Sequence, residues 1–193
     1  TMPHVKAMMD KLVAAGYDAD YVSDRQLRAL ETKRGELISE GDARYRTLLI
    51  PASHKLPTET LEHLIDLAEG GATILFLDCY PDDVPGFGRL KERDEFRALL
   101  SRLPDDADFA AAEAHSLGRG RIITGNDFDE MVQLAGIRPE PFKREMGGVM
   151  MRRKNEVGGH NYFLSMLHDN PVDGWVRLAT TARAVMIFDP MTG

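Results

Sequence analysis

ATILFLD, residues 72–78, is the most apolar run of the chain and decides the fold. It follows Gly71 and comes shortly before the turn-rich segment PDDVPGFG (81–88), so turn-forming residues bound it on both sides. A short continuous apolar run between turn signals is typical of a strand that is buried on both faces, as in the middle of a parallel sheet. We therefore expect residues 72–78 to be the central strand of an α/β domain.

The segments on either side of this run alternate between helix and strand patterns. Apolar residues recur at helical spacing in some segments, and short apolar or β-prone runs separate them. Such alternation implies right-handed crossovers and a mostly parallel sheet with helices on both faces. The pattern predicts strands at 17–23, 44–51, 72–78 and 118–124, and helices at 3–15, 24–31, 57–70, 89–103 and 126–136.

The pattern changes after Pro139 and Pro141, which divides the chain into an α/β domain (1–140) and a second module (141–193). The second module has short β-like runs separated by Gly, Asn, Asp and Pro, without a helical period. We expect an antiparallel β module in which EVGGHN (156–161) is a hairpin loop. The four β-like runs are GVMMRRK, NYFLSML, GWVRLAT and RAVMIFD.

The sequence patterns at both ends indicate that this chain is a piece of a longer polypeptide. A doubly wound domain normally opens with a strand, whereas this chain opens with the predicted helix 3–15. At the other end, FDPMTG (188–193) directly follows a predicted strand of an unfinished sheet. We therefore expect the first strand of the α/β domain to be missing.

Composition excludes several classes of partner. The formal net charge is −7, with 31 acidic and 24 basic side chains, so a nucleic-acid backbone is not an expected partner. No apolar run approaches the ~20 residues that cross a bilayer, so no membrane partner is expected. The single cysteine, Cys79, excludes an internal disulfide framework and leaves the cellular compartment open.

The motifs of common catalytic and cofactor sites are absent from the sequence. A cysteine nucleophile needs small neighbours at a strained elbow, whereas Cys79 lies between Asp78 and Tyr80 and no helix pattern follows directly. The carboxylates of Asp82, Asp83 and the run 104–109 are more typical of solvated loops than of a catalytic pair or a metal site. Glycine-rich phosphate loops and HExxH spacing are missing, so we predict no cofactor, no metal and no catalytic residue.

Topology suggests where contacts with substrate or with a neighbouring domain would lie. In open α/β sheets, ligands gather beyond the carboxyl ends of the strands. The predicted strand ends place Asp24, His54, Asp78 and Tyr80 there, and these four are the candidates for contact with a substrate or an interface. The ordinary alternatives are a helix cap for Asp24, a loop position for His54 and a packed ring for Tyr80.

Four segments carry a resemblance to a known family. They are GYDADYVSDRQL (16–27), YRTLLIP (45–51), LPTETLEHLIDLAEGGATILFLD (56–78) and the block from RRKNEVGGHNYFL to MIFDPMTG (152–193). In order and spacing, the chain resembles glycoside hydrolase family 106, the α-L-rhamnosidases, over nearly its whole length. The resemblance implies that a catalytic barrel precedes this region, that β-sandwich modules follow it, and that the first domain is flavodoxin-like and similar to glutamine-amidotransferase domains.

The resemblance implies a non-catalytic accessory region of an enzyme that acts on rhamnose-containing polysaccharides or glycosides. The expected partner is the catalytic barrel of the same polypeptide, and carbohydrate or a second copy of the chain are further partners left open. A periplasmic or extracellular location is implied by the family alone. Two alternatives remain at this point: a stand-alone flavodoxin-like module for binding or oligomerisation, and a cysteine or carboxylate hydrolase.

Overall fold

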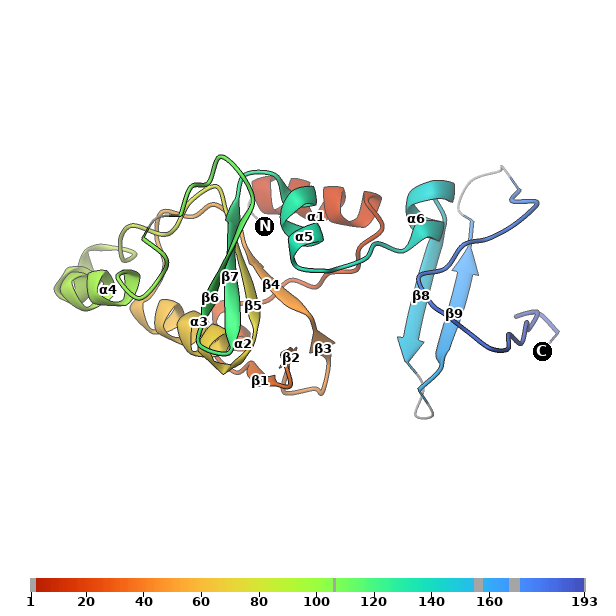
Figure 1. Cartoon of the computed structure of the whole chain (residues 1–193), viewed down its shortest axis with the longest axis horizontal. Coiled ribbons are helices and arrows are strands. Elements are labelled where there is room, and N and C mark those ends of the chain that lie inside the picture. Colours follow the sequence, from red (N-terminus) through yellow and green to blue (C-terminus); the bar gives the residue numbers. More distant parts are fainter. Residues whose placement is uncertain (1–2, 106, 155–157, 167–170, 193) are drawn as a thin grey trace. The chain divides into compact units, whose positions relative to one another are not determined.

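The computed structural model describes residues 3–105, 107–154, 158–166 and 171–192 (Figure 1). The chain divides into two compact units. Residues 20–137 form the first, which we call the sheet unit, and residues 1–19 with 138–193 form the second, the hairpin unit. The domain boundary near residue 140 stays a prediction.

A four-stranded sheet organises the sheet unit. It contains β4 (Thr47–Ile50), β5 (Thr73–Leu77), β6 (Glu113–Leu117) and β7 (Gly120–Gly125) in the spatial order β4-β5-β7-β6. Strand β5 pairs in parallel with both β4 and β7, and β6 runs antiparallel to β7. All five residues of β5 are buried. The prediction of a mixed α/β fold with a mostly parallel sheet and an apolar central strand is therefore confirmed.

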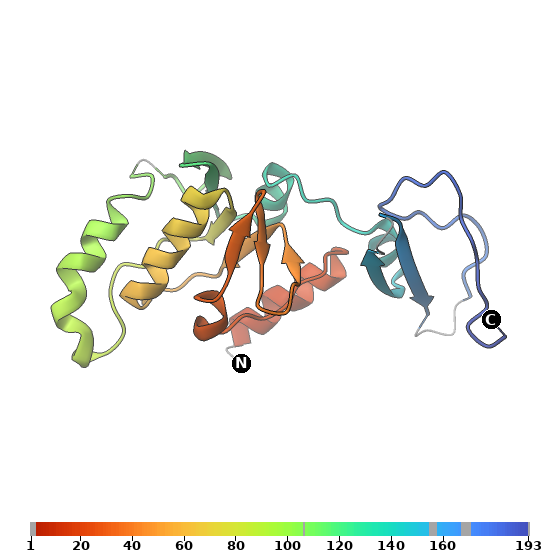
Figure 2. The ribbon, with the colours of Figure 1, turned by 90° about the horizontal axis from the view of Figure 1, so that it is seen from below.

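Helices cover both faces of this sheet because successive side chains of a strand point to opposite faces. Ile74 and Phe76 join the core beneath α3 (Thr58–Gly70) and α4 (Arg93–Leu100), which follows the 3₁₀ helix η1 (Phe87–Glu92). Leu75, Leu77 and Ile123 are buried on the other face, where α5 (Phe128–Leu134) lies. Figure 1 shows α3 and α5 on opposite sides of the sheet, and Figure 2 shows α4 beside α3.

A small antiparallel sheet was not predicted. It consists of β1 (Glu31–Lys33), β2 (Glu36–Ile38) and β3 (Arg44–Tyr45). Arg34 and Gly35 both have positive φ angles, 55° and 79°, which is the geometry of a tight two-residue hairpin turn. The predicted strand 44–51 is divided between the two sheets, because β3 pairs with β2 and β4 pairs with β5.

The predictions for residues 17–31 were partly wrong. Residues 17–23 form no strand, and the predicted helix 24–31 is limited to α2 (Asp24–Leu27). Ser23 is the N-cap: its side chain accepts from the Gln26 backbone N–H, and the Gln26 side chain accepts from the Ser23 backbone N–H at 3.0 Å. This reciprocal capping box fixes the start of the helix at Asp24, directly after its N-cap.

Two glycines allow β7 to approach α3. A Cβ at Gly120 would overlap the carbonyl oxygens of Ala68 and Ala72, and a Cβ at Gly118 would overlap the backbone of Glu69. Gly118 also has a φ of +59°, which most side chains disfavour. The turn between β6 and β7 therefore packs backbone against backbone at the end of α3.

The hairpin unit joins the two ends of the chain. It contains α1 (Pro3–Ala14), α6 (Pro141–Met146) and the antiparallel pair β8 (Val149–Lys154) and β9 (His160–Ser165). The backbone N–H of Glu140 donates to the Gly16 carbonyl at 2.7 Å, and Lys143 pairs with Asp18. The buried Glu140 side chain accepts from the Ala179 N–H at 2.5 Å. These contacts hold segments from both ends of the sequence together.

The antiparallel pairing predicted for this region is confirmed for β8 and β9. The predicted hairpin turn 156–161 lies partly outside the described residues. The predicted β-like runs 174–180 and 183–189 are described and form no strand, and α6 was not predicted. Several large apolar side chains of these runs are exposed: Trp175, Val185, Met186, Ile187 and Phe188.

Gly120→Ala is expected to destabilise the sheet unit, because the added Cβ overlaps two carbonyl oxygens. Overpacking of this kind costs about 1–3 kcal/mol in the free energy of unfolding. Gly88→Ala is the matched control, since a Cβ there has nothing within 4 Å among the described residues, and it should change stability by less than about 0.5 kcal/mol. Urea unfolding followed by circular dichroism measures both variants. Equal losses would contradict the close approach of β7 and α3.

Candidate functional site

The segments that follow β4 and β5 are bound to each other at the carboxyl edge of the sheet. We call residues 51–57 and 78–86 the edge loops. Lys55 and Asp83 form a parallel bridge, and the Leu56 N–H donates to the Asp83 carbonyl at 3.1 Å. The N–H groups of Asp82 and Asp83 both donate to the His54 carbonyl, at 3.0 and 3.1 Å. The edge loops therefore behave as one connected structure at the place where ligands of α/β sheets gather.

His54 lies in the first edge loop and pairs with Asp82 of the second. Its Nδ1 lies 3.0 Å from Asp82 Oδ2. Both side chains are well exposed, at 76% and 67% of their surface. Water therefore screens this pair, and its contribution to stability is expected to be small. The pair is available for contact with another molecule.

Asp78 directly follows β5 with a φ of +67°. Asp and Asn tolerate this left-handed conformation better than most residues do. The Asp78 N–H donates to the Gly125 carbonyl at 2.8 Å, which continues the β5–β7 ladder by one bond, and its side chain is exposed. In a strand-to-helix elbow, the nucleophile itself has a positive φ. Here the residue with a positive φ is Asp78, not Cys79.

Cys79 is half-buried, and its N–H donates to the Leu77 carbonyl at 2.9 Å. The next helical segment, η1, begins only at Phe87. A nucleophile elbow needs a helix directly after the strand, so that backbone N–H groups can hold an oxyanion. This geometry does not suit Cys79 to nucleophilic catalysis.

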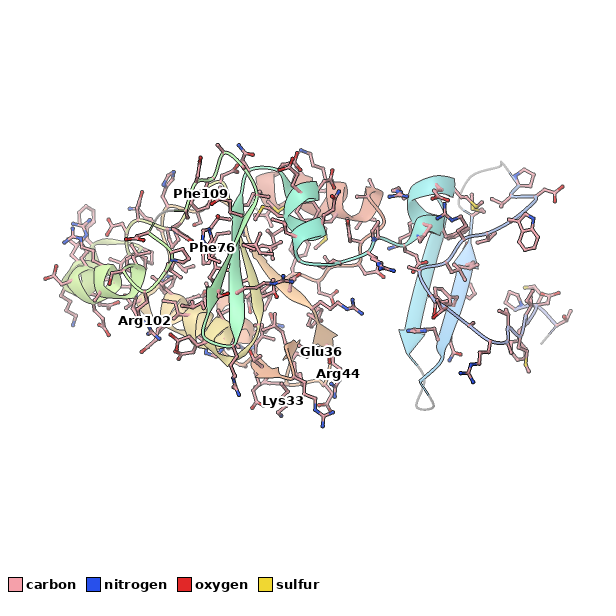
Figure 3. All side chains as sticks on the ribbon, viewed as in Figure 1. Lys33, Glu36, Arg44, Phe76, Arg102 and Phe109 are labelled. Carbon is pink, nitrogen blue, oxygen red and sulfur yellow. The ribbon has the colours of Figure 1, made fainter. Side chains whose placement is uncertain are left out.

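Tyr80 packs into the core. Its ring lies edge-on to Phe76, with ring centroids 5.0 Å apart, and edge-on to Phe109 at 5.1 Å. Figure 3 labels Phe76 and Phe109. Edge-to-face pairs of this kind stabilise packing beyond the area they bury. Tyr80 therefore anchors the second edge loop on the sheet.

Asp24 lies at the start of α2, and residues 3–23 contain no strand. Its Oδ1 accepts a hydrogen bond from the Thr60 hydroxyl at 3.0 Å. This bond connects α2 to the first turn of α3. Three of the four candidates, His54, Asp78 and Tyr80, therefore lie in the edge loops, which are bound to each other. Asp24 lies outside the edge loops and is bonded to α3 through Thr60.

Two arginines hold carboxylates of the sheet unit. The sequence pattern gave no indication of Glu59, and the prediction that Asp83 is a solvated loop charge was wrong, because its side chain is only 23% exposed and Arg93 binds it. Arg93 donates to both oxygens of Asp83, at 2.7 and 2.5 Å, and this lowers the pKa of Asp83 to about 2. The Val84 N–H, which also donates to the Asp83 carboxylate, acts in the same direction. Asp83 is therefore ionised at every physiological pH and fixes the second edge loop to the start of α4.

The second pair joins α3 to η1. Arg89 donates to both oxygens of Glu59, at 2.5 and 2.8 Å, and to Glu92 at 3.2 Å. The bonds from Arg89, followed by the bond from the backbone N–H of Glu59, lower the pKa of Glu59 to about 2. The partners are 30 residues apart in the sequence, and no local pattern indicates such a pairing.

The described part of the chain contains no group of three or more His, Cys, Asp and Glu side chains placed to hold a metal ion. In the same residues, no helix is both long and apolar enough to cross a membrane.

Replacing Arg89, the partner of Glu59, should reduce the loss of stability that occurs as the pH falls below about 4.5. Because the pKa of folded Glu59 is lower than its ordinary 4.5, its contribution is present above about pH 4.5 and is lost as the pH falls to about 2. Both side chains are about one-third exposed, so Arg89→Met should cost only about 0.2–1 kcal/mol at pH 7. Urea unfolding at neutral pH and near pH 3 measures the change.

Arg97→Met is the matched control for this experiment. Arg97 pairs with Asp94 on the surface, where the two side chains are largely exposed, and its loss should leave the pH dependence unchanged. A wild-type pH dependence in Arg89→Met would show that the Glu59 pair does not contribute.

Comparison with known proteins gives three matches. Residues 3–193 match the model of glycoside hydrolase family 106, described as alpha-L-rhamnosidase. The solved structure of a rhamnosidase from Novosphingobium sp. PP1Y is similar in fold, with a TM-score of 0.60 and 23% sequence identity over 78% of this chain. A putative beta-glucuronidase from Formosa agariphila is 27% identical over 73 residues, or 38% of this chain.

The chain spans only a small part of these relatives. It covers 14% of the Novosphingobium rhamnosidase and 6% of the Formosa protein. The family model, in contrast, covers all but the first two residues of the chain, from the start of α1 through both units. This chain belongs to glycoside hydrolase family 106, the α-L-rhamnosidase family.

Proposed function

We propose that this chain is a non-catalytic accessory region of an α-L-rhamnosidase and that hydrolysis takes place in another part of the same polypeptide. The substrates of the whole enzyme would be rhamnose-containing polysaccharides or glycosides. In this proposal, the sheet unit and the hairpin unit support the catalytic domain and do not contact the bond that is cleaved.

One support for this proposal is that two carboxylates of the sheet unit, Glu59 and Asp83, are unsuited to acid catalysis. Glycosidases normally need one carboxyl group with a raised pKa as the general acid and a second as base or nucleophile. Glu59 and Asp83 have the opposite shift, to about 2, because each accepts two hydrogen bonds from an arginine. A carboxylate in such a pair can neither donate a proton near neutral pH nor attack a sugar without first losing its partner.

The size of the match also supports the proposal. A rhamnosidase of similar fold has a chain of which this sequence covers 14%, so most of that polypeptide lies outside the matched region. We therefore assign the chemistry to the remainder of the polypeptide.

We also propose that the sheet unit is flavodoxin-like and similar to amidotransferase domains, without their nucleophile. The parallel strands β4, β5 and β7 lie in spatial order, and both helices that cover one face, α3 and α4, follow β4 and β5. Right-handed crossovers that move in one direction across a sheet place their helices on the same face. The helix α5, which follows β7, covers the opposite face, so this sheet has helices on both faces, as a complete doubly wound sheet does.

The test separates the chain from the full-length polypeptide that carries it. The full-length protein should release the aryl group from an aryl α-L-rhamnoside, and the isolated 193-residue chain should show no turnover. In the full-length protein, His54→Ala and Asp78→Asn should change kcat by less than about twofold, whereas loss of a general acid or base typically costs about 10²–10⁴-fold. Turnover by the isolated chain would refute the proposal.

A loss of more than about a hundredfold in kcat, with unchanged stability, in either variant would place an edge loop in the active site. Cys79→Ala serves as the control for the cysteine hydrolase alternative, and it should leave kcat unchanged because the thiol lacks an elbow. Thermal unfolding of each variant distinguishes loss of chemistry from loss of structure.

A further inference from the structure

The 3₁₀ helix η1 presents two apolar side chains to solvent. Phe87 is 91% exposed and Leu90 is 40% exposed. In a 3₁₀ helix, side chains at positions i and i+3 eclipse each other, so Phe87 and Leu90 lie along one line. We call these two side chains the Phe87 ridge. A Cβ at neighbouring Gly86 or Gly88 would meet nothing within 4 Å among the described residues, so the ridge stands clear of its own loop.

Polar contacts on other side chains of η1 hold the ridge in place. Arg89 binds Glu59 of α3 through two hydrogen bonds and also donates to Glu92 at 3.2 Å. The Thr58 hydroxyl donates to Glu92 at 3.1 Å. The helix η1 itself buries no residue, so these polar contacts, together with its continuation into α4, fix its position.

A fixed and exposed aromatic side chain is typical of an interface. Isolated exposed apolar residues are common, but here a large aromatic residue and a leucine are aligned on a braced helix. Aromatic side chains are enriched in the buried centres of interfaces, where a few anchors contribute most of the binding. Because η1 is already ordered, docking of the ridge would require little additional ordering of the chain.

We propose that the Phe87 ridge docks into an apolar socket on another domain of the same polypeptide. This inference rests on the proposed function, since it requires a longer parent enzyme. The match covers 14% of a rhamnosidase chain, so most of such a polypeptide is available as a partner. A tethered domain has an effective concentration of about millimolar, which favours it over a free second copy.

Thiol footprinting in the full-length polypeptide tests the proposal. Gly88→Cys introduces a thiol beside the ridge without removing Phe87 or Leu90, and iodoacetamide labelling is read for the peptide that contains position 88. Labelling should be at least about tenfold slower in the full-length protein than in the isolated chain. Burial of a Phe side chain stabilises the docked state by at least about 1.4 kcal/mol, which corresponds to this factor. Gln133→Cys, on the exposed face of α5, is the control and should react equally in both.

Adding Phe87→Asp to Gly88→Cys should restore fast labelling in the full-length protein, because a charged side chain disfavours an apolar socket. Equal labelling of the Gly88→Cys thiol in the full-length protein and in the isolated chain would refute the docking. Labelling of the isolated chain that slows as its concentration rises would instead identify a second copy as the occupant and would also overturn the proposal.

Activity of the same samples on an aryl α-L-rhamnoside separates the two proposals. Turnover by the full-length protein with no protection at position 88 would overturn the docking and leave the proposed function intact. Turnover by the isolated chain would overturn the proposed function, whatever the labelling result.

Discussion

Strand β5 lies between β4 and β7, and the whole sheet unit depends on its burial. Its two neighbours hydrogen-bond its backbone from both sides, so none of its five residues needs water. Its side chains must then be covered on both faces, which requires a helix layer on each. This requirement is met by α3 on one face and by α5 on the other. The close approach of Gly120 to the end of α3 lets β7 pack beside that helix.

The charged residues of the sheet unit serve mainly to fix its connections. Arg93 joins the second edge loop to α4 through Asp83, and Arg89 joins η1 to α3 through Glu59. Two-pronged arginine bonds are specific in direction and keep the carboxylates ionised. The same chemistry that orders these loops removes the proton that an acid catalyst would need. Structural order at this edge and acid catalysis by these carboxylates are therefore mutually exclusive.

The sequence predicted those features that depend on local pattern. The apolar run 72–78, the helical period of residues 57–70 and the helix near 126–136 were confirmed, because burial of these segments leaves a clear mark in composition and spacing. The small sheet of β1–β3 was missed, since its strands are two or three residues long and rich in charge. The strand β6, EAHSL, was missed because it is a polar edge strand.

Contacts between distant segments could not be predicted in the same way. Nothing in the spacing of Glu59 and Arg89, or of Asp83 and Arg93, distinguishes them from other charged pairs of this chain. The first pair joins α3 to η1 and the second joins an edge loop to α4, so both depend on how these segments pack in three dimensions. Asp78 and Tyr80 follow β5, and their role as contacts for a substrate or an interface stays a prediction. The inward packing of Tyr80 against Phe76 is visible only in the three-dimensional structure.

The hairpin unit is assembled from the first and the last parts of the chain, and this sets an order of events during synthesis. The sheet unit is continuous in sequence and can fold as soon as it leaves the ribosome. Asp18, in contrast, must wait for Lys143, which is synthesised 125 residues later. At about 5–20 residues per second, that delay is about 6–25 s. During this time the contacts of residues 3–19 with α6 and Glu140 cannot form, so the hairpin unit is completed only after the sheet unit has been synthesised.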